Sequence, residues 1–450
     1  MRAEPVGAPV DLLIENANVV TVDGGNRVFA NGAVAIRGRD IVAVGAAADV
    51  TERLDGAPGR VIDARGGIVL PGFVNLHTHL AMTLLRGWAD DVDLQAFLDR
   101  VFPTEAAIVS PSTVRVGTNL AIAESLRAGI TCSLDMYFHP EVTADAARQA
   151  GVRIANGPVI FSFPGPDHLN YPERIQQAES LLREAQAGGG LTEGRWVCAH
   201  GTYTIERDHL VEVHDLAERH GAGFTIHAAE NAAEVATVVA QHGRRPVELL
   251  HDLGLLGPRT VLAHCVDLTG EEIAMIARSG ASVAHNPLSN MKLGSGFAPV
   301  PELLEAGVRV GLGTDGAASS NDLDLYQAMR FAATIHKGRS GDATVVAAAT
   351  ALRMATIDGA TALGLGDVLG SIEVGKRADL QILAADRPHL VPSYDPISTV
   401  VYAAGRGDVR TVLVDGRVVL DDFRLTTIDL ERTIAEARQI AQSVRSTSRD

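Results

Sequence analysis

Short, uninterrupted apolar runs recur along the middle of the chain, and segments with helical periodicity separate them. The runs lie at 72–77, 130–136, 153–160, 195–200, 223–228, 260–264, 282–285 and 308–313. Continuous apolar runs are typical of strands that are buried on both faces of a parallel sheet. Amphipathic segments fall between them, for example at 112–128, 172–186, 206–220, 231–242 and 270–279. This alternation predicts an α/β fold, and in particular a (β/α)8 barrel.

The two ends of the chain have a different pattern, in which short alternating strands are separated by turn residues. Near the N-terminus the strand-like stretches are Leu12–Ile14, Val19–Val22, Ala33–Ile36 and Ile41–Val44, with hairpin turns expected at 23–26 and 31–32. The same texture returns at 378–383 and 409–419. Because neither end can bury both faces of its strands alone, we expect the two ends to pair into one β-sandwich, followed by a closing helix at 428–446. The predicted divisions are 1–68 for the N-terminal part of the sandwich, 69–368 for the barrel, and 369–450 for the C-terminal part with the helix.

Composition narrows the class of protein. Of the 450 residues 46% are hydrophobic, which is enough for a large core, and the net charge of −16 with no long basic run argues against nucleic-acid binding. No apolar stretch approaches the roughly 18 residues that a membrane span requires, and the N-terminus lacks the apolar region of a signal peptide. Cys132, Cys198 and Cys265 have no close spacing and are expected to be small buried residues in a reducing compartment. We therefore expect a cytoplasmic protein with a small-molecule ligand.

Histidines stand at the ends of the predicted strands. His77 and His79 close the first run, and side chains two residues apart on a strand point to the same side. Later runs end in histidine or aspartate: His200, His227, His264, His285 and Asp315. The carboxyl ends of barrel strands meet at one mouth, and imidazole is the commonest metal ligand in proteins. The pattern predicts a metal site, although a single histidine at a strand end is more often structural.

The order of these residues is similar to that of the amidohydrolase superfamily: His-x-His, then histidines after the fifth and sixth strands, then aspartate after the eighth. Four segments resemble more closely the 5-methylthioadenosine/S-adenosylhomocysteine deaminases and their triazine-hydrolase relatives. They are 79–91, 264–266, 284–293 and 311–319. The resemblance extends from about residue 10 to about residue 420.

The resemblance implies one divalent metal per chain, Zn²⁺ with Fe²⁺ as the alternative. Its ligands would be His77, His79, His227 and Asp315, which leave a position open for a water molecule. Binuclear members of the superfamily use a carbamylated lysine after the fourth strand. Here no lysine precedes Lys292, so we expect a mononuclear site.

The resemblance also implies three catalytic roles. Asp315 would accept a proton from the attacking water, and His264 would orient that water and stabilise the developing negative charge. Glu230 would protonate a ring nitrogen of the substrate, so that ammonia can leave. Taken in isolation, Glu230 is better explained as an acidic residue that stabilises a helix N-terminus, but its position three residues after the expected ligand His227 favours catalysis.

Three further residues would contact the substrate. His200 matches a family histidine that contacts the purine from the side opposite Glu230, and Glu105 matches a carboxylate that accepts hydrogen bonds from the ribose hydroxyls. Trp88 is a candidate for stacking on the base. The alternatives are a hydrogen-bonded wall residue for His200, a helix-start glutamate for Glu105 and simple packing for Trp88.

The chain also departs from the family pattern. Gly157 stands where S-adenosylhomocysteine-active members carry an arginine for the amino-acid carboxylate, and Arg174 is the only arginine shortly beyond it. Asn231 follows Glu230, where threonine is usual. The missing arginine places a substrate with a free carboxylate tail in doubt, and the change at Asn231, next to the expected proton donor, is a candidate for tuning substrate choice.

The leading hypothesis is a metal-dependent aminohydrolase of a 6-aminopurine nucleoside such as 5′-methylthioadenosine, 5′-deoxyadenosine, adenosine or S-adenosylhomocysteine. One alternative is an aminohydrolase or chlorohydrolase of another N-heterocycle, such as an oxidised purine base, a pterin or an s-triazine. Another is a non-catalytic barrel scaffold, which loss of ligand residues would mark. The resemblance further implies a homo-oligomer.

Overall fold

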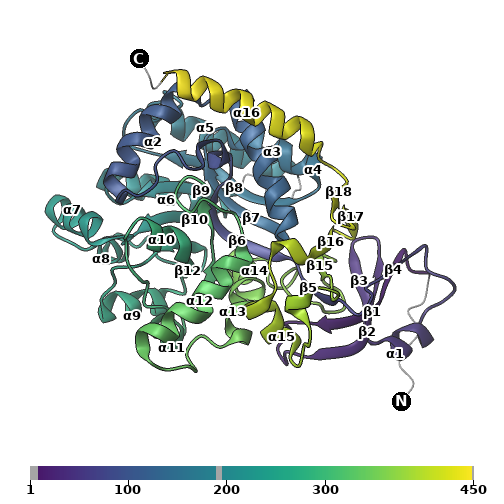
Figure 1. Ribbon diagram of the computed structural model, residues 1–450. Helices are drawn as coiled ribbons and strands as arrows, with labels where there is room; N and C mark the ends of the chain where they lie inside the picture. The colour runs from purple at the N-terminus through teal and green to yellow at the C-terminus, as the bar shows by residue number, and fades with distance from the viewer. Residues whose placement is uncertain (1–8, 189–194, 448–450) are drawn as a thin grey trace. The chain divides into compact units, whose positions relative to one another are not determined.

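The computed structural model describes residues 9–188 and 195–447, and these form two compact units (Figure 1). The first, called the sheet unit, comprises the described residues up to Val74 together with Glu124–Cys132 and Asp324–Thr427. The second, called the barrel unit, comprises Asn75–Ala123, Ser133–Leu323 and the described residues from Ile428 onward. All the candidate site residues belong to the barrel unit.

The barrel sheet has the order β13-β12-β11-β10-β9-β8-β7-β6-β14. Its strands are β6 (Phe73–His79), β7 (Ile130–Tyr137), β8 (Arg153–Ile160), β9 (Trp196–Gly201), β10 (Gly223–Ala228), β11 (Thr260–His264), β12 (Ser282–His285), β13 (Arg309–Leu312) and β14 (Asp315–Gly316). The last strand is interrupted, so that β13 pairs with β12 while β14 pairs with β6, with Asp315 opposite Thr78. These pairings close the sheet and confirm the predicted barrel.

Helices follow the barrel strands, close to where the sequence predicted them. They are α2 (Leu94–Ile108), α3 (Pro111–Arg127), α4 (Pro140–Ala150), α5 (Tyr171–Gly188), α6 (Arg207–His220), α7 (Ala232–His242), α8 (Pro246–Asp252), α9 (Gly270–Ser279), α10 (Pro287–Lys292) and α11 (Val300–Glu305). Local signals set several of their ends. Thr269 and Glu272 form a reciprocal capping box at the start of α9, and Gly280 ends this helix in the left-handed region at φ 78°.

The sheet unit contains one mixed sheet that both chain ends build, as expected. Its order is β18-β17-β16-β15-β5-β1-β2-β3, with β4 paired to β1. The strands are β1 (Leu12–Val20), β2 (Val28–Arg37), β3 (Asp40–Ala46), β4 (Arg60–Asp63), β5 (Ile68–Pro71), β15 (Leu380–Leu383), β16 (Val409–Val414), β17 (Arg417–Asp421) and β18 (Arg424–Leu425). Side chains from strands at both chain ends, such as Ile14 and Leu413, belong to one buried cluster. The short α1 (Ala47–Glu52) and the helices α12 (Leu325–Ser340), α13 (Ala348–Met354), α14 (Ile357–Ala362) and α15 (Pro396–Ser398) complete this unit.

One N-terminal turn was predicted correctly and one was not. The turn at 23–26 forms, with the Asn26 N–H donating to the Asp23 carbonyl at 2.9 Å. The hairpin expected at 31–32 is absent, because Asn31 and Gly32 lie inside β2. Asn31 adopts a left-handed φ of 50°, and a Cβ at Gly32 would lie 2.8 Å from Val19 Cγ2. The turn-like residues therefore produce an irregularity within a strand, where the backbones approach closely.

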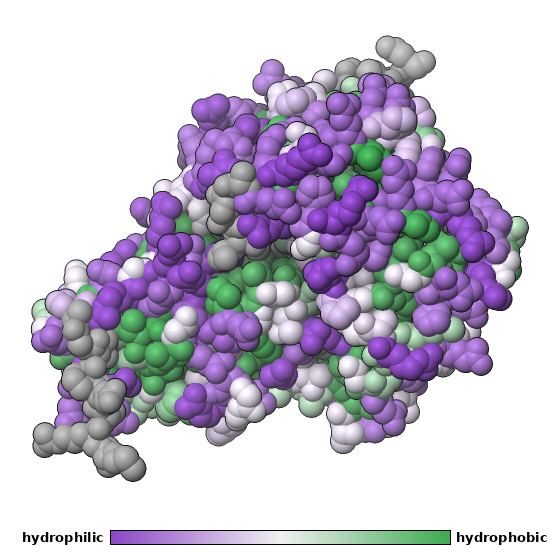
Figure 2. Space-filling view, turned by 180° about the vertical axis from the view of Figure 1, so that it is seen from behind, coloured by the Kyte–Doolittle hydropathy of each residue, from purple (hydrophilic) through white to green (hydrophobic). Residues whose placement is uncertain are grey.

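The predicted C-terminal helix is α16 (Leu430–Thr447), shown in yellow in Figure 1. It belongs to the barrel unit, where it contacts the 3-10 turn η1 (Leu80–Leu85). In the described part of the chain, no helix combines the length and apolar character needed to cross a bilayer. The face shown in Figure 2 is largely polar, with apolar residues in small separate patches.

Candidate active site

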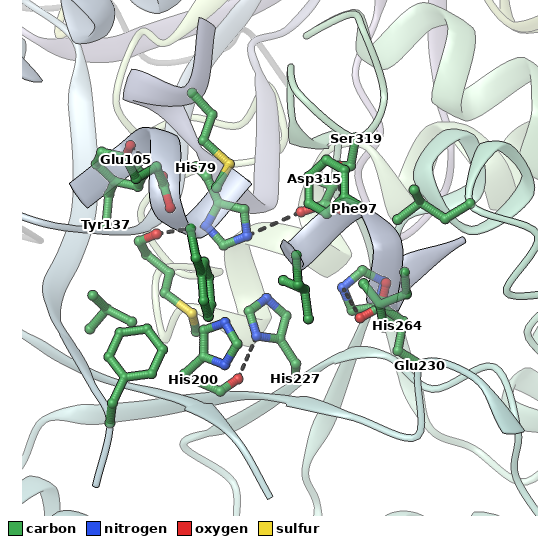
Figure 3. A pocket seen from close by; sticks show the side chains of 18 of the residues that line it. His79, Phe97, Glu105, Tyr137, His200, His227, Glu230, His264, Asp315 and Ser319 are labelled. Atoms are coloured by element: carbon green, nitrogen blue, oxygen red, sulfur yellow. Dashed lines mark hydrogen bonds and ion pairs between the residues drawn. The ribbon is translucent and has the colours of Figure 1, made fainter. Parts of the chain in front are cut away.

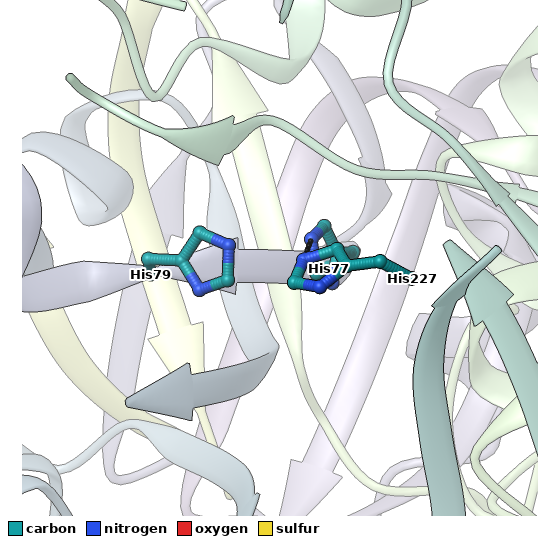
Figure 4. Close-up of side chains that lie close together, drawn as sticks. All are labelled: His77, His79 and His227. Carbon is teal, nitrogen blue, oxygen red and sulfur yellow. Dashed lines mark hydrogen bonds between the residues drawn. The ribbon is translucent and has the colours of Figure 1, made fainter. Parts of the chain in front are cut away.

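Three histidines and one aspartate converge at the carboxyl ends of the barrel strands. His77 and His79 come from β6, and His227 comes from β10 (Figure 4). The Nε2 atoms of His77 and His227 are 3.2 Å apart. Asp315 Oδ1 lies 3.4 Å from His77 Nε2 and 3.1 Å from His79 Nε2. The sequence separates these side chains by up to 238 positions, and the closed barrel brings them to one point.

Hydrogen bonds on the outer side of two of these rings fix which nitrogen faces the centre. His79 Nδ1 donates to the Met136 carbonyl at 2.6 Å, and His227 Nδ1 donates to the His200 carbonyl. A neutral imidazole that donates through Nδ1 presents a lone pair at Nε2. Nitrogen lone pairs and a carboxylate oxygen thus face one another in a buried space, an arrangement that suits a divalent cation with three nitrogen ligands and one oxygen ligand. The side chains of His77, His79 and His227 lie close enough to hold one metal ion, and so do those of His77, His264 and Asp315.

Asp315 is placed by an unusual backbone. Its φ is 59°, a left-handed value that costs a non-glycine residue about 1–3 kcal/mol and clusters at functional sites. Ser319 donates from Oγ to Asp315 Oδ2 at 2.7 Å, which leaves Oδ1 directed at the histidines. A Cβ at Gly313 would lie 2.9 Å from the His77 carbonyl, so this glycine permits close approach to β6. The segment 311–319 therefore serves strand packing and ligand placement.

His264 and Glu230 lie together on one side of the histidine cluster. His264 Nδ1 lies 2.8 Å from Asn290 Oδ1, which turns Nε2 toward Glu230, whose Oε2 is 3.8 Å away. Both side chains are buried, and burial raises the pKa of Glu230 above its ordinary value. A glutamate with a raised pKa is suited to act as a proton donor near neutral pH.

Glu234 fixes the backbone that carries Glu230. Its carboxylate accepts hydrogen bonds from the Glu230 N–H at 2.6 Å and from the Ala229 N–H at 3.2 Å. Ala229 itself has a left-handed φ of 52°. The departure noted at Asn231 has a local explanation, because Asn231 caps α7 by accepting from the Glu234 N–H at 2.8 Å. Threonine can also cap a helix, so the two residues share this role.

The cluster opens into a mainly apolar cavity, whose space outside protein atoms is about 610 Å³ including its opening. Figure 3 shows most of its lining side chains. In Figure 3 the polar residues of the wall run from Glu105 and Tyr137 at the left to Glu230 and His264 at the right. His79, His200 and His227 lie between these pairs, and Asp315 also lines the cavity. The rest is largely aromatic and aliphatic, from Met82, Leu94, Phe97, Leu98, Phe102, Met136, Phe138, Val159, Phe161 and Leu293.

Glu105 lies inside this cavity. It sits in α2, so it is not a helix-start residue, and only 1% of its surface is exposed. The Tyr137 hydroxyl donates to Glu105 Oε1 at 2.6 Å. Burial raises the pKa of Glu105 to about 7, even though the Tyr137 hydrogen bond and the charge on His79 oppose this rise. Figure 3 places Glu105 and Tyr137 on the side of the cavity away from Glu230 and His264.

His200 also lines the cavity, and Figure 3 shows it and Glu230 on either side of His227. Its Nδ1 lies 3.1 Å from Thr204 Oγ1, and its ring centroid is 4.6 Å from that of Phe161. Burial is the main cause that lowers the pKa of His200 to about 3, so the ring stays neutral. His285, by contrast, is buried and is not one of the residues that line the cavity in the described chain.

Trp88 and Arg174 lie outside the cavity. The Trp88 indole donates to Thr104 Oγ1 at 2.9 Å and packs against an apolar cluster that includes Leu94 and Phe97. Arg174 is 1% exposed, donates to the Val159 carbonyl at 3.0 Å and forms an ion pair with Asp167. Trp88 is thus not among the described residues that line this cavity, and its contact with a substrate stays a prediction.

Gly157, noted above as a departure, has a steric explanation. A Cβ at this position would lie 1.7 Å from the Trp196 carbonyl oxygen. A larger residue cannot be accommodated there without moving β8 away from β9.

Several site residues were missed in the sequence. Tyr137 extends β7 one residue beyond the predicted run, and Glu234 and Asn290 act through hydrogen bonds that only the fold creates. Ser319 lies in the segment 311–319 that resembles the deaminases, and its position four residues after Asp315 was the one signal available.

Comparisons with known proteins agree with this geometry. The model of the amidohydrolase family matches residues 68–419. A 5-methylthioadenosine/S-adenosylhomocysteine deaminase of Syntrophobacter fumaroxidans is 44% identical over 97% of this chain and 98% of its own length. The solved structure of an adenosine deaminase from Xanthomonas campestris with bound zinc superposes with a TM-score of 0.94 at 40% identity, covering 98% of this chain and 99% of the other. A triazine hydrolase from Arthrobacter aurescens superposes with a TM-score of 0.88 at 26% identity, covering 96% and 99%.

The closed barrel, the ligand cluster and these matches define the class: the chain belongs to the amidohydrolase family. It is therefore a hydrolase, and the matches above include deaminases of adenosine derivatives as well as a triazine hydrolase.

Proposed function

We propose that this protein is a hydrolytic deaminase that releases ammonia from the 6-amino group of a purine nucleoside. The observation that carries the proposal is the arrangement of one cavity. A candidate metal cluster lies beside a buried acid, Glu230, and a carboxylate suited to hydroxyl groups, Glu105, lies across an apolar space. Relatives that are 40–44% identical carry deaminase names, which supports the same reaction for this chain.

We assign the metal ligands to His77, His79, His227 and Asp315. The cation, for which we propose one Zn²⁺ per chain, supplies Lewis-acid activation of the attacking water. Fe²⁺ accepts the same nitrogen and oxygen donors, so metal analysis decides between them. Because Ser319 engages Oδ2 of Asp315, the aspartate presents Oδ1 to the cluster and can take a proton there.

Glu230 and His264 act on the substrate from one side. Glu230 donates a proton to the ring nitrogen next to the amino-bearing carbon, which makes that carbon more electrophilic. His264 donates from Nδ1 to Asn290 Oδ1, and although burial opposes it, the charges of Glu230 and Asp315 raise its pKa. In its protonated form Nε2 also carries a proton, which stabilises negative charge that develops on the attacking oxygen. After addition, Asp315 passes its proton to the amino group, the C–N bond breaks and ammonia leaves, and the new hydroxyl becomes a carbonyl as its proton returns to Glu230.

Glu105 and His200 bind the rest of the substrate. With Tyr137 on Oε1, the Oε2 atom of Glu105 is available to accept a ribose hydroxyl. His200 is neutral and forms a wall beside the aromatic rings, where it can contact the purine edge. Adenosine, 5′-deoxyadenosine and 5′-methylthioadenosine all carry this diol and base, and they are the substrates we propose.

The test is ammonia release from the purified protein across a panel of nucleosides, free purine bases, a pterin and chlorinated or aminated s-triazines. We expect the nucleosides to exceed adenine by well over tenfold in kcat/KM. The triazine-hydrolase match is the reason to include the last class. If a free base or a triazine is the best substrate, the nucleoside proposal is wrong, even though hydrolase chemistry remains.

A further inference from the structure

A second hollow adjoins the cavity along the outer part of α2. Gln95, Leu98, Asp99, Phe102, Pro103 and Tyr203 line it, and we call it the outer recess. Three of these residues, Leu98, Phe102 and Tyr203, also line the cavity of the active site. The two spaces therefore share a wall, and the recess is less enclosed than the cavity.

Helical spacing relates the recess to Glu105. Leu98, Phe102 and Glu105 follow one another at intervals of four and three residues on α2, so they lie along one face of the helix. Glu105, at the inner end of this row, is buried, whereas Leu98 and Phe102 are partly exposed. A ribose bound through its hydroxyls at Glu105 thus has the row of α2 residues beside it, leading outward from the cavity to the recess.

Apart from the histidines and the metal proposed beside them, the charged side chains that line these spaces are acidic. Glu105, Glu230 and Asp315 line the cavity, and Asp99 lines the recess, where it accepts from Gln95 Nε2 at 2.9 Å. Among the described residues, neither space is lined by arginine or lysine.

One buried cation that contacts the cavity wall is already neutralised. The guanidinium carbon of Arg174 lies 5.3 Å from the ring centroid of Phe161, and Arg174 is paired with Asp167. It cannot serve a ligand in the cavity without breaking this buried pair.

We propose that the outer recess is the subsite for the 5′ substituent of the nucleoside, an inference that rests on the proposed function. The recess accepts an uncharged thioether or a tail that ends in an ammonium group, and it disfavours a tail that carries a carboxylate. The physical reason is that a carboxylate there meets Asp99 with no cation to compensate, whereas an ammonium group is attracted.

The first experiment compares three substrates that share the adenosine thioether. They are 5′-methylthioadenosine, S-adenosylhomocysteine and the decarboxylated analogue of S-adenosylhomocysteine, which retains the ammonium group. We expect the methylthio and decarboxylated compounds to exceed S-adenosylhomocysteine by at least tenfold in kcat/KM. Equal values for S-adenosylhomocysteine and its decarboxylated analogue overturn the proposal.

The second experiment changes the charge of the recess with Asp99→Asn and Asp99→Arg. Asp99 is exposed and its hydrogen bond to Gln95 is local, so both variants should fold. An exposed charge pair contributes up to about 1 kcal/mol, or about fivefold. We therefore expect the preference for the decarboxylated analogue over S-adenosylhomocysteine to fall about fivefold in Asp99→Asn and further in Asp99→Arg.

The matched control is Glu305→Arg. Glu305 is an exposed acid at the end of α11, just before β13, and it lines neither space. Glu305→Arg should leave the ratio of kcat/KM for the decarboxylated analogue and S-adenosylhomocysteine unchanged. If it changes this ratio as much as Asp99→Arg does, the effect comes from the net charge of the protein, and the subsite is refuted. If no adenosine thioether is deaminated at all, the proposed function fails. If they are deaminated but the ratio does not respond to Asp99, only the subsite fails.

Discussion

Removal of the Glu105 carboxylate should convert a nucleoside deaminase into an enzyme that barely distinguishes a nucleoside from its base. A hydrogen bond from a hydroxyl to a charged carboxylate contributes about 1.5–3 kcal/mol, or about 10- to 150-fold. We therefore expect Glu105→Ala to lower kcat/KM for adenosine by about this factor and to leave the slow reaction with adenine unchanged. Glu105→Gln keeps an acceptor but no charge, and it should retain an intermediate preference.

The same substitution should also lower the stability of the free protein. Glu105→Ala leaves the buried Tyr137 hydroxyl without its 2.6 Å acceptor, which destabilises the fold by about 1–3 kcal/mol. The assay therefore measures kcat and KM for adenosine and adenine at a temperature well below the unfolding midpoint of each variant. Tyr137→Phe is the control, because it removes the same hydrogen bond and keeps the carboxylate. Equal losses on base and nucleoside in Glu105→Ala would refute the reasoning.

Four further predictions follow from the site. Glu230→Gln should keep the metal and lose about 10²- to 10⁴-fold in kcat, since an amide cannot donate the proton; activity within threefold of the parent enzyme would exclude the role. Glu234→Ala should lower kcat much more than it changes KM at full metal content, because it frees the Ala229–Glu230 backbone; an unchanged kcat would contradict this. Metal analysis should give about one equivalent per chain, with activity lost to a chelator and restored by Zn²⁺; two equivalents that are both required would contradict a mononuclear site. The KM for adenosine should fall as pH rises through about 7, because burial raises the pKa of Glu105 to about 7 and only the ionised form is a strong acceptor. This pH dependence should disappear in Glu105→Gln.

The domain boundaries at 68 and 368 and the homo-oligomer remain predictions. The two compact units divide the chain differently, since Glu124–Cys132 and Asp324–Thr427 belong to the sheet unit. Gel filtration with light scattering would measure the oligomeric state directly.

The sequence by itself determined the barrel and the identity of the candidate ligands. Buried parallel strands must be apolar on both faces, so their runs are continuous and can be recognised without any tertiary information. Polar residues such as His77, His227 and Asp315 then stand out at the ends of those runs. Turn residues were less informative, because Asn31 and Gly32 adopt conformations that serve a turn and a strand irregularity equally well.

Only the tertiary structure decided which polar residues share a space. Trp88 and Glu105 were equal candidates in the sequence, but Trp88 packs against Leu94 and Phe97 while Glu105 enters the cavity beside Tyr137. For Trp88 the reason is that it lies in the irregular segment between η1 and α2, whose path depends on tertiary packing, and for Glu105 it is that the direction of a helical side chain depends on how the helix is rotated against the barrel. That rotation is set by the packing of the whole apolar face, and no local residue pattern specifies it.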